Sequence, residues 1–132
     1  MISASHNPAE YNGIKIFSGD GYKIPDALEE QIESIVLDDE AEQALSGTDI
    51  GKVTYATNAI KDYVDHLKST VMNSLEGLNI AVDCANGSAS VSADKLFAAL
   101  GANADILHNK PDGININCDC GSTPVSYTHL RA

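Results

Sequence analysis

Basic residues are scarce in this sequence, and arginine occurs only once, at Arg131. Lys and Arg together number 8 against 19 Asp and Glu residues, which gives a formal net charge of −11. Proteins that bind nucleic acid or anionic lipid need a basic surface, so we expect no nucleic-acid partner and no membrane partner. A phosphorylated substrate would have to be held by local hydrogen-bond donors or by a metal ion.

Long apolar runs are absent as well. No stretch approaches the roughly eighteen consecutive apolar residues of a membrane-spanning helix. Residues 1–13 lack the basic segment and the apolar segment of a secretory signal peptide. These two absences, together with the odd number of cysteines discussed next, predict a cytoplasmic protein.

The three cysteines are Cys84, Cys118 and Cys120. An odd number without a signal peptide favours reduced thiols over a disulfide framework. The pair Cys118 and Cys120 could indicate a metal site, but a structural zinc site uses four ligands and Cys84 alone does not complete the set. We therefore expect three unreactive thiols. His66 and His108 lie in no recognisable motif and are expected at the surface.

The pattern of apolar residues predicts an α/β fold, with 132 residues and 43% hydrophobic residues sufficient for the core of one ordinary domain. Apolar positions at helical spacing predict one helix that begins near Pro25 and a second over residues 58–72. A strand over 78–83, a helix that ends near Leu100 and a strand over 104–107 form a βαβ unit with two parallel strands. We also expect a short strand over 14–17, inward-facing side chains at Leu78 and Val91, and mixed sheets flanked by helices.

The loop S-A-S-H-N-P at residues 3–8 is the most informative segment for chemistry. Taken alone, its Ser, Asn and Pro residues are typical of a turn. The sequence has no G-x-S-x-G motif and no Walker-type phosphate loop, so a serine hydrolase or a P-loop enzyme is poorly supported. A hydroxyl beside His6 and Asn7, with Lys15 a few residues later, could instead carry a phosphoryl group.

This loop, followed by Y-N-G-I-K at 11–15 and F-S-G-D-G-Y-K at 17–23, resembles the α-D-phosphohexomutase superfamily, and within it the phosphoglucosamine mutase branch. The segments V-D-C-A-N-G, P-D-G-I-N-I-N and C-G-S-T of the second half resemble the same family in the same order. The resemblance implies that residues 1–75 correspond to the later part of the family's first domain, and 76–123 to the beginning of its second. The chain is then a fragment.

The resemblance implies a role for six residues. Ser5 corresponds to the phosphorylated serine, which passes its phosphoryl group to a sugar phosphate and regains one from the bisphosphorylated intermediate. His6 and Asn7 correspond to residues that steady the phosphoserine and approach the substrate. Lys15 corresponds to a general acid/base or phosphate clamp, and Asn12 and Gly13 shape the turn before it. Ser3 corresponds to a variable position outside the transfer chemistry.

The implied cofactor is Mg²⁺, bound by the phosphate on Ser5 and by three aspartates of a D-x-D-x-D-R loop. The aspartates of this chain do not have that spacing, so we assign none of them to the metal; they include Asp20, Asp83, Asp112 and Asp119. The implied substrates are glucosamine 6-phosphate and glucosamine 1-phosphate, on the route to cell-wall precursors. We expect the fragment alone to be inactive, and the oligomeric state is not indicated.

Two alternatives remain open at this point. Phosphomannomutases and phosphoglucomutases share the S-H-N-P core, and a free-standing acidic α/β binding module would need no catalysis at all. Residues 124–132 bear on neither of these alternatives. The segment V-S-Y-T-H-L-R-A resembles the translated end of a sequencing adapter, although an ordinary polar C-terminus is the alternative. We therefore assign no function to its side chains.

Overall fold

The structure is a computed structural model that describes residues 1–37 and 46–122. Its elements in chain order are α1 (Asp26–Leu37), η1 (Gly47–Asp49), α2 (Ala59–Thr70), β1 (Asn79–Asp83), η2 (Ser88–Val91), α3 (Ala93–Ala99) and β2 (Asn103–Leu107). The chain divides into two compact units: Met1–Ser3 with Gly13–Tyr55, and Ala4–Asn12 with Ala56–Ala132. The predicted α/β class is confirmed.

The first unit contains α1, which begins directly after Pro25 as predicted. Asp26 and Glu29 occupy its first turn, where the helix dipole favours negative charge. Both carboxylates lie 2.8 Å from the Lys23 ammonium, and the hydrogen bond to Asp26, followed by that to Glu29, raises the pKa of Lys23. No residue of α1 is buried, so the apolar stripe that gave the helix its period remains at the surface.

The strand predicted over residues 14–17 does not form. Ile14 makes a single antiparallel bridge with Ile2, and Phe17 makes another with Lys23. Each bridge pairs one residue only, because the two ends of the segment turn to different neighbours. Without one continuous partner strand, the backbone hydrogen bonds of this segment cannot extend into a ladder.

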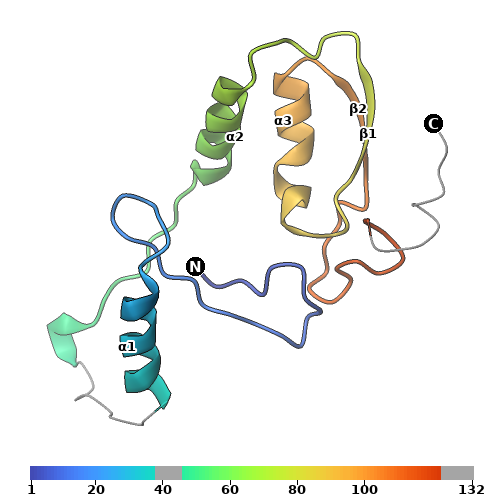
Figure 1. Ribbon diagram of the computed structural model, residues 1–132. Helices are drawn as coiled ribbons and strands as arrows, with labels where there is room; N and C mark the ends of the chain where they lie inside the picture. Colours follow the sequence, from blue (N-terminus) through green and yellow to red (C-terminus); the bar gives the residue numbers. More distant parts are fainter. Residues whose placement is uncertain (38–45, 123–132) are drawn as a thin grey trace. The chain divides into compact units, whose positions relative to one another are not determined.

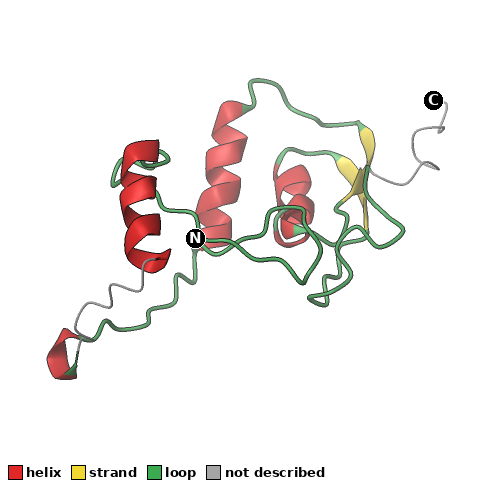
Figure 2. Cartoon of the chain, turned by 60° about the horizontal axis from the view of Figure 1, so that its bottom comes forward, coloured by secondary structure: helices red, strands yellow, loops and turns green. Residues whose placement is uncertain are grey.

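The second unit contains the predicted βαβ arrangement, with α3 lying between β1 and β2 in sequence (Figure 1). The strands pair in parallel, with Asn79 opposite Asn103 and Asp83 opposite Leu107. Gly101 follows the C-cap of α3, in the connection to β2, with a φ of +83°, a conformation that glycine adopts without strain. Both strands therefore end at the same edge of the two-stranded sheet, seen as the yellow arrows of Figure 2.

The core of this unit forms where α2, α3 and the sheet meet. Val64 of α2 is buried in the middle of its predicted apolar stripe, and Leu100 is buried at the end of α3. Two positions predicted to face inward are exposed instead: Leu78 at 51% and Val91 at 50%. Val91 lies in η2, whose 3₁₀ turn has three residues per turn and shifts the side chain off the helical stripe. Leu78 precedes the first paired residue of β1.

The compact units do not coincide with the predicted domain division near residue 75, since α2 belongs to the second unit. That division concerns the family's domains and stays a prediction. Residues 124–132 lie outside the described residues, as do 38–45. Among the helices that the structure describes, none has the length and apolarity required to cross a membrane.

Candidate active site

The predicted nucleophile lies in a tight turn of the serine loop, the name used here for Ala4–Asn12. The Asn7 N–H donates to the Ala4 carbonyl at 3.2 Å, so Ser5 and His6 are the central residues of that turn. Ser5 has a φ of +61°, in the left-handed region that costs a residue with a β-carbon about 1 kcal/mol or more. The backbone strain of this loop therefore falls on the residue predicted to react.

His6 is brought close to this hydroxyl. Ser5 Oγ lies 3.4 Å from His6 Nδ1, and both residues are exposed to solvent. The tautomer of the imidazole decides whether the ring nitrogen accepts or donates in this contact. In either form, the ring nitrogen lies within hydrogen-bonding distance of an exposed hydroxyl.

The remaining predicted site residues divide between the two units. Asn7 and Asn12 are exposed members of the serine loop, whereas Gly13 and Lys15 belong to the first unit. Gly13 accepts a hydrogen bond from the Ser3 N–H at 2.8 Å. A β-carbon at Gly13 would lie 3.0 Å from the Ser3 carbonyl oxygen, so this close approach of two backbones favours glycine. Lys15 is exposed, and its N–H donates to the Met1 carbonyl at 2.8 Å.

Sequence reasoning missed Asp83, which ends β1 and joins three segments of the second unit. One carboxylate oxygen accepts the Ala85 N–H at 2.8 Å, and the other accepts the Gly121 N–H at 2.9 Å. The second oxygen also lies 3.1 Å from His108 Nδ1. Burial alone would raise the pKa of Asp83, but the two N–H donors and His108 outweigh it, so the pKa lies below its usual value. The parallel register was the available signal, because it places the ends of β1 and β2 side by side.

Asp83, His108 and Cys120 form a cluster whose donor atoms lie within 4.8 Å of one another. Asp83 already accepts two N–H groups, and Cys120 is fully buried. Burial, and then the charge of Asp83, raises the pKa of the Cys120 thiol, which disfavours the thiolate that metals bind. A set of nitrogen, sulfur and one carboxylate also does not suit Mg²⁺, which takes oxygen ligands. We interpret this cluster as structural.

The surroundings of the two buried thiols, Cys84 and Cys120, favour the low reactivity that the sequence predicts. Burial raises the pKa of Cys84, and the neighbouring Asp83 and Asp94 carboxylates raise it further. Cys84 and Cys120 are both buried, whereas Cys118 is exposed, and all three are free of disulfides. A buried, protonated thiol is a poor nucleophile.

We predict that Asp83 titrates below its ordinary value of about 3.9 and that His108→Ala raises this pKa without restoring it, because the N–H donors of Ala85 and Gly121 remain. A carboxyl whose pKa is lowered by folding stabilises the fold above its unfolded pKa. That stabilisation is lost as the pH falls through the folded pKa. The measurement is the pH titration of the Asp83 carboxyl carbon by NMR in both chains. A wild-type midpoint at or above 3.9 would contradict the assignment of these hydrogen bonds.

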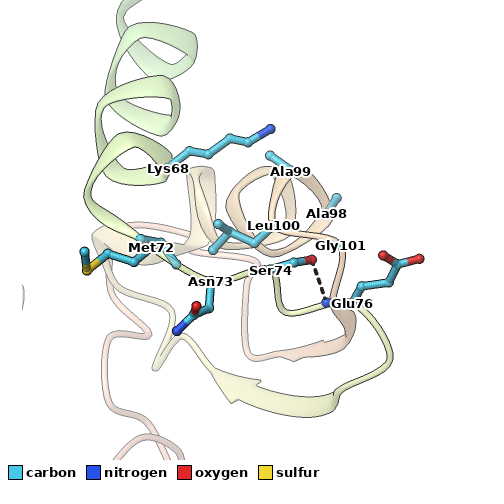
Figure 3. A pocket seen from close by; sticks show the side chains of 10 residues that line it. Lys68, Met72, Asn73, Ser74, Glu76, Ala98, Ala99, Leu100 and Gly101 are labelled. Atoms are coloured by element: carbon cyan, nitrogen blue, oxygen red, sulfur yellow. Dashed lines mark hydrogen bonds between the residues drawn. The ribbon is translucent and has the colours of Figure 1, made fainter.

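A surface hollow lies elsewhere in the second unit, at the C-terminal ends of α2 and α3 (Figure 3). Lys68 extends from α2 toward Ala99 of α3. In the segment that connects α2 to β1, the Glu76 N–H donates to Ser74 Oγ at 3.1 Å. The residues lining the hollow include none of the predicted site residues. The serine loop remains the candidate active site.

The serine loop lies in a part of the chain that matches a known protein family. Residues 1–43 match the model of the family described as phosphoglucomutase/phosphomannomutase, alpha/beta/alpha domain I. The chain is 51% identical over 126 residues to a phosphoglucosamine mutase of Acetivibrio thermocellus, an alignment that covers 95% of this chain. It is 50% identical to that of Clostridium beijerinckii and 51% identical to that of Alkaliphilus oremlandii, each over 124 residues and 93% of this chain.

These findings confirm the predicted resemblance to the phosphohexomutases and extend it beyond the residues of the family model. The chain spans 28% of the length of each of these three relatives. Their names describe isomerases that act on a phosphorylated amino sugar. The match includes the serine loop and the βαβ unit.

Proposed function

We propose that this chain is the part of a phosphoglucosamine mutase that carries the reacting serine, Ser5. The observation that supports this most directly is the exposed hydroxyl of Ser5, set on a strained turn 3.4 Å from His6, within residues that match a phosphohexomutase domain. Relatives at about half identity over nearly the whole chain are named phosphoglucosamine mutase. The proposed reaction interconverts glucosamine 6-phosphate and glucosamine 1-phosphate.

In the proposed reaction, Ser5 Oγ starts as a phosphate ester. A free hydroxyl of the sugar phosphate attacks the phosphorus and gives up its proton to a base, while the bond from phosphorus to Ser5 Oγ breaks and the departing Ser5 Oγ takes up a proton to become a hydroxyl again. The resulting bisphosphorylated sugar then returns its other phosphoryl group to Ser5 Oγ. Phosphoryl transfer of this kind depends mainly on positioning and on charge stabilisation. The fixed turn around Ser5 supplies the first of these.

The other predicted residues serve the same transfer. His6 and Asn7 follow Ser5 in the turn and would contribute a ring group and an amide group to the binding of the phosphate. Lys15 supplies a positive charge or a proton to the transferring group. Asn12, together with Gly13 of the first unit, shapes the turn that precedes Lys15.

Mg²⁺ is the proposed cofactor, and it would neutralise charge on the transferring phosphoryl group. Within the described residues, Ser5 offers one ligand through its phosphate oxygen. The described residues contain one cluster of three side chains that could bind a metal, and it includes His108 and Cys120. Its nitrogen and sulfur ligands do not suit Mg²⁺. The three aspartates of a D-x-D-x-D-R loop would supply the remaining ligands, and the printed sequence contains no such motif.

The test is a chimera in which residues 1–122 of this chain replace the matching segment of the Acetivibrio thermocellus relative. We expect the chimera to convert glucosamine 6-phosphate to glucosamine 1-phosphate, measured by coupled assay with Mg²⁺. The same assay with mannose and glucose 6-phosphates separates the glucosamine branch from its neighbours. A folded chimera that turns over none of the three sugars would refute the proposal.

We further predict that the 132-residue chain by itself has no mutase turnover. It contributes the proposed nucleophile, but only 28% of the length of the relatives, and it contains no D-x-D-x-D-R motif. The measurement is conversion of glucosamine 6-phosphate by the purified chain with Mg²⁺, beside the intact relative as the positive control. Turnover above the protein-free blank would show this prediction to be wrong.

A further inference from the structure

The serine loop is held by a residue from the other end of the chain, Asn117. The Asn117 side-chain amide donates from Nδ2 to the His6 carbonyl oxygen at 3.1 Å, across 111 residues of sequence. Both residues belong to the second compact unit. No sequence motif connects these two positions, so this contact is visible only in the folded chain.

The acceptor of this hydrogen bond lies in the turn that carries Ser5. The His6 carbonyl and the Asn7 N–H belong to one peptide group. The Asn7 N–H donates to the Ala4 carbonyl, while Asn117 donates to the carbonyl at the other end of the group. Because a peptide group is planar, fixing both ends fixes its orientation. The orientation of the adjoining Ser5 backbone is restricted as a result.

Asn117 is itself anchored through its backbone, and its side chain lies close to Gly121. Its N–H donates to the Ala85 carbonyl at 2.9 Å, and its φ of +56° is a conformation that asparagine tolerates better than most residues. Its side-chain oxygen lies only 3.3 Å from where a β-carbon at Gly121 would be. Gly121 is therefore the small residue that leaves room for the amide.

The residues that contact Asn117 are themselves hydrogen-bonded to the end of strand β1. Ala85 donates to one oxygen of Asp83 and Gly121 donates to the other, and Asp83 is the last residue of β1. Ala85, which accepts the Asn117 N–H, and Gly121, which lies beside the Asn117 amide, are thus tied to the end of β1 by charge-assisted hydrogen bonds. A group held in this way can transmit the geometry of the sheet edge to the serine loop.

We propose that Asn117 is a positioning residue, whose amide holds the His6 peptide group and thereby sets the orientation of Ser5 for phosphoryl transfer. Asn117 touches neither Ser5 nor its phosphate in this role. The catalytic part of the inference rests on the proposed function, whereas the restraint on the loop does not. The two parts can therefore be tested separately.

The test compares Asn117→Asp with a matched control, Asn115→Asp. Both replace an amide by a carboxylate of the same size in the same loop, and both remove a side-chain NH2 group that donates one hydrogen bond. The Asn115 amide donates to the Lys110 carbonyl at 3.0 Å, within its own loop. In the ¹⁵N-labelled 132-residue chain, we expect Asn117→Asp to lower the heteronuclear NOE of Ser5 and His6. We also expect it to speed hydrogen exchange of the Asn7 amide about tenfold.

Asn115→Asp should leave these signals unchanged. The Cys84 amide, which donates to the Leu107 carbonyl at 3.0 Å, reports whether β1 and β2 remain paired in each variant. If the Cys84 amide is no longer protected in Asn117→Asp, the second variant is Asn117→Ser. It removes the same donor without adding a charge and should loosen the serine loop alone. An unchanged serine loop in folded Asn117→Asp or Asn117→Ser, or equal loosening by Asn115→Asp, would overturn the restraint.

The chimera supplies the catalytic measurement. Asn117→Asp should lower kcat about tenfold with little change in KM, because the sugar phosphate still binds while the nucleophile is misoriented. Asn115→Asp should change neither. If the loop loosens in the labelled chain but the unmutated chimera has no turnover, the proposed function fails and the restraint stands. If the chimera is active and Asn117→Asp keeps its full kcat, the positioning role fails and the proposed function stands.

Discussion

Replacing Ser5 by alanine in the chimera is expected to reduce turnover by several orders of magnitude while substrate binding persists. The substitution removes the one oxygen that the proposed mechanism uses to carry the phosphoryl group between half-reactions. The other groups that bind the sugar phosphate remain, so its dissociation constant should change little. Turnover is measured by coupled assay and binding by calorimetry, and the chimera without substitutions provides the reference for both.

Ser3→Ala is the matched control for this prediction, since Ser3 is a second serine two residues earlier in the chain. Its N–H donates to the Gly13 carbonyl, and a backbone donor is unaffected by the loss of a hydroxyl. We expect turnover close to that of the reference, and mass spectrometry should place the phosphate of the resting protein on Ser5. Phosphate on Ser3, or normal turnover in Ser5→Ala, would assign the nucleophile elsewhere.

The second large effect is expected for Lys15→Ala, which should lower turnover by about 10² to 10⁴-fold, the usual scale for losing a general acid/base or a charged clamp. The proposed cause is the loss of a positive charge at the transferring phosphate. Ser5 keeps its hydroxyl, so the variant should still be isolated in a phosphorylated form. This retained phosphate distinguishes Lys15→Ala from Ser5→Ala in the same mass-spectrometric measurement.

Lys23→Ala is the control for charge. Lys23 is also a lysine of the first unit, and it is engaged with Asp26 and Glu29 at the start of α1. Its removal changes the net charge by the same amount, but we expect turnover to fall less than about threefold, because exposed ion pairs contribute little. Equal losses in the two variants would mean that the effect of Lys15 is a general effect of charge.

Local sequence patterns were sufficient for most of the secondary structure. The helical period of Ile60, Val64 and Leu67 predicted α2, and the strand–helix–strand pattern predicted the parallel pair β1 and β2. Such patterns are local. The spacing of apolar residues over a few positions determines whether they share one face of a helix or of a strand. The helix predicted to end near Leu100 ends at Ala99, and Gly101 follows with a positive φ. The S-A-S-H-N-P loop likewise drew attention to Ser5 without any knowledge of the fold.

Burial and pairing depended on neighbours that these patterns do not specify. The stripe of α1 has the same period as that of α2, yet α1 buries none of its residues while α2 buries Val64. Residues 14–17 were predicted to form a strand but find only single bridging partners. The sequence pattern therefore predicted the helices and the parallel strand pair, whereas neighbouring segments determined whether residues 14–17 paired as a strand and which helix faces are covered.

The sequence by itself determined the α/β class, the elements of the βαβ unit and the loop in which the candidate nucleophile lies. Only the tertiary structure showed that Asp83 joins the loops beyond β1 and β2, and that Asn117 reaches the His6 carbonyl. The physical reason is distance along the chain. Those hydrogen bonds join residues 38 and 111 positions apart, and their partners meet only after parallel pairing has brought two strand ends to one edge of the sheet.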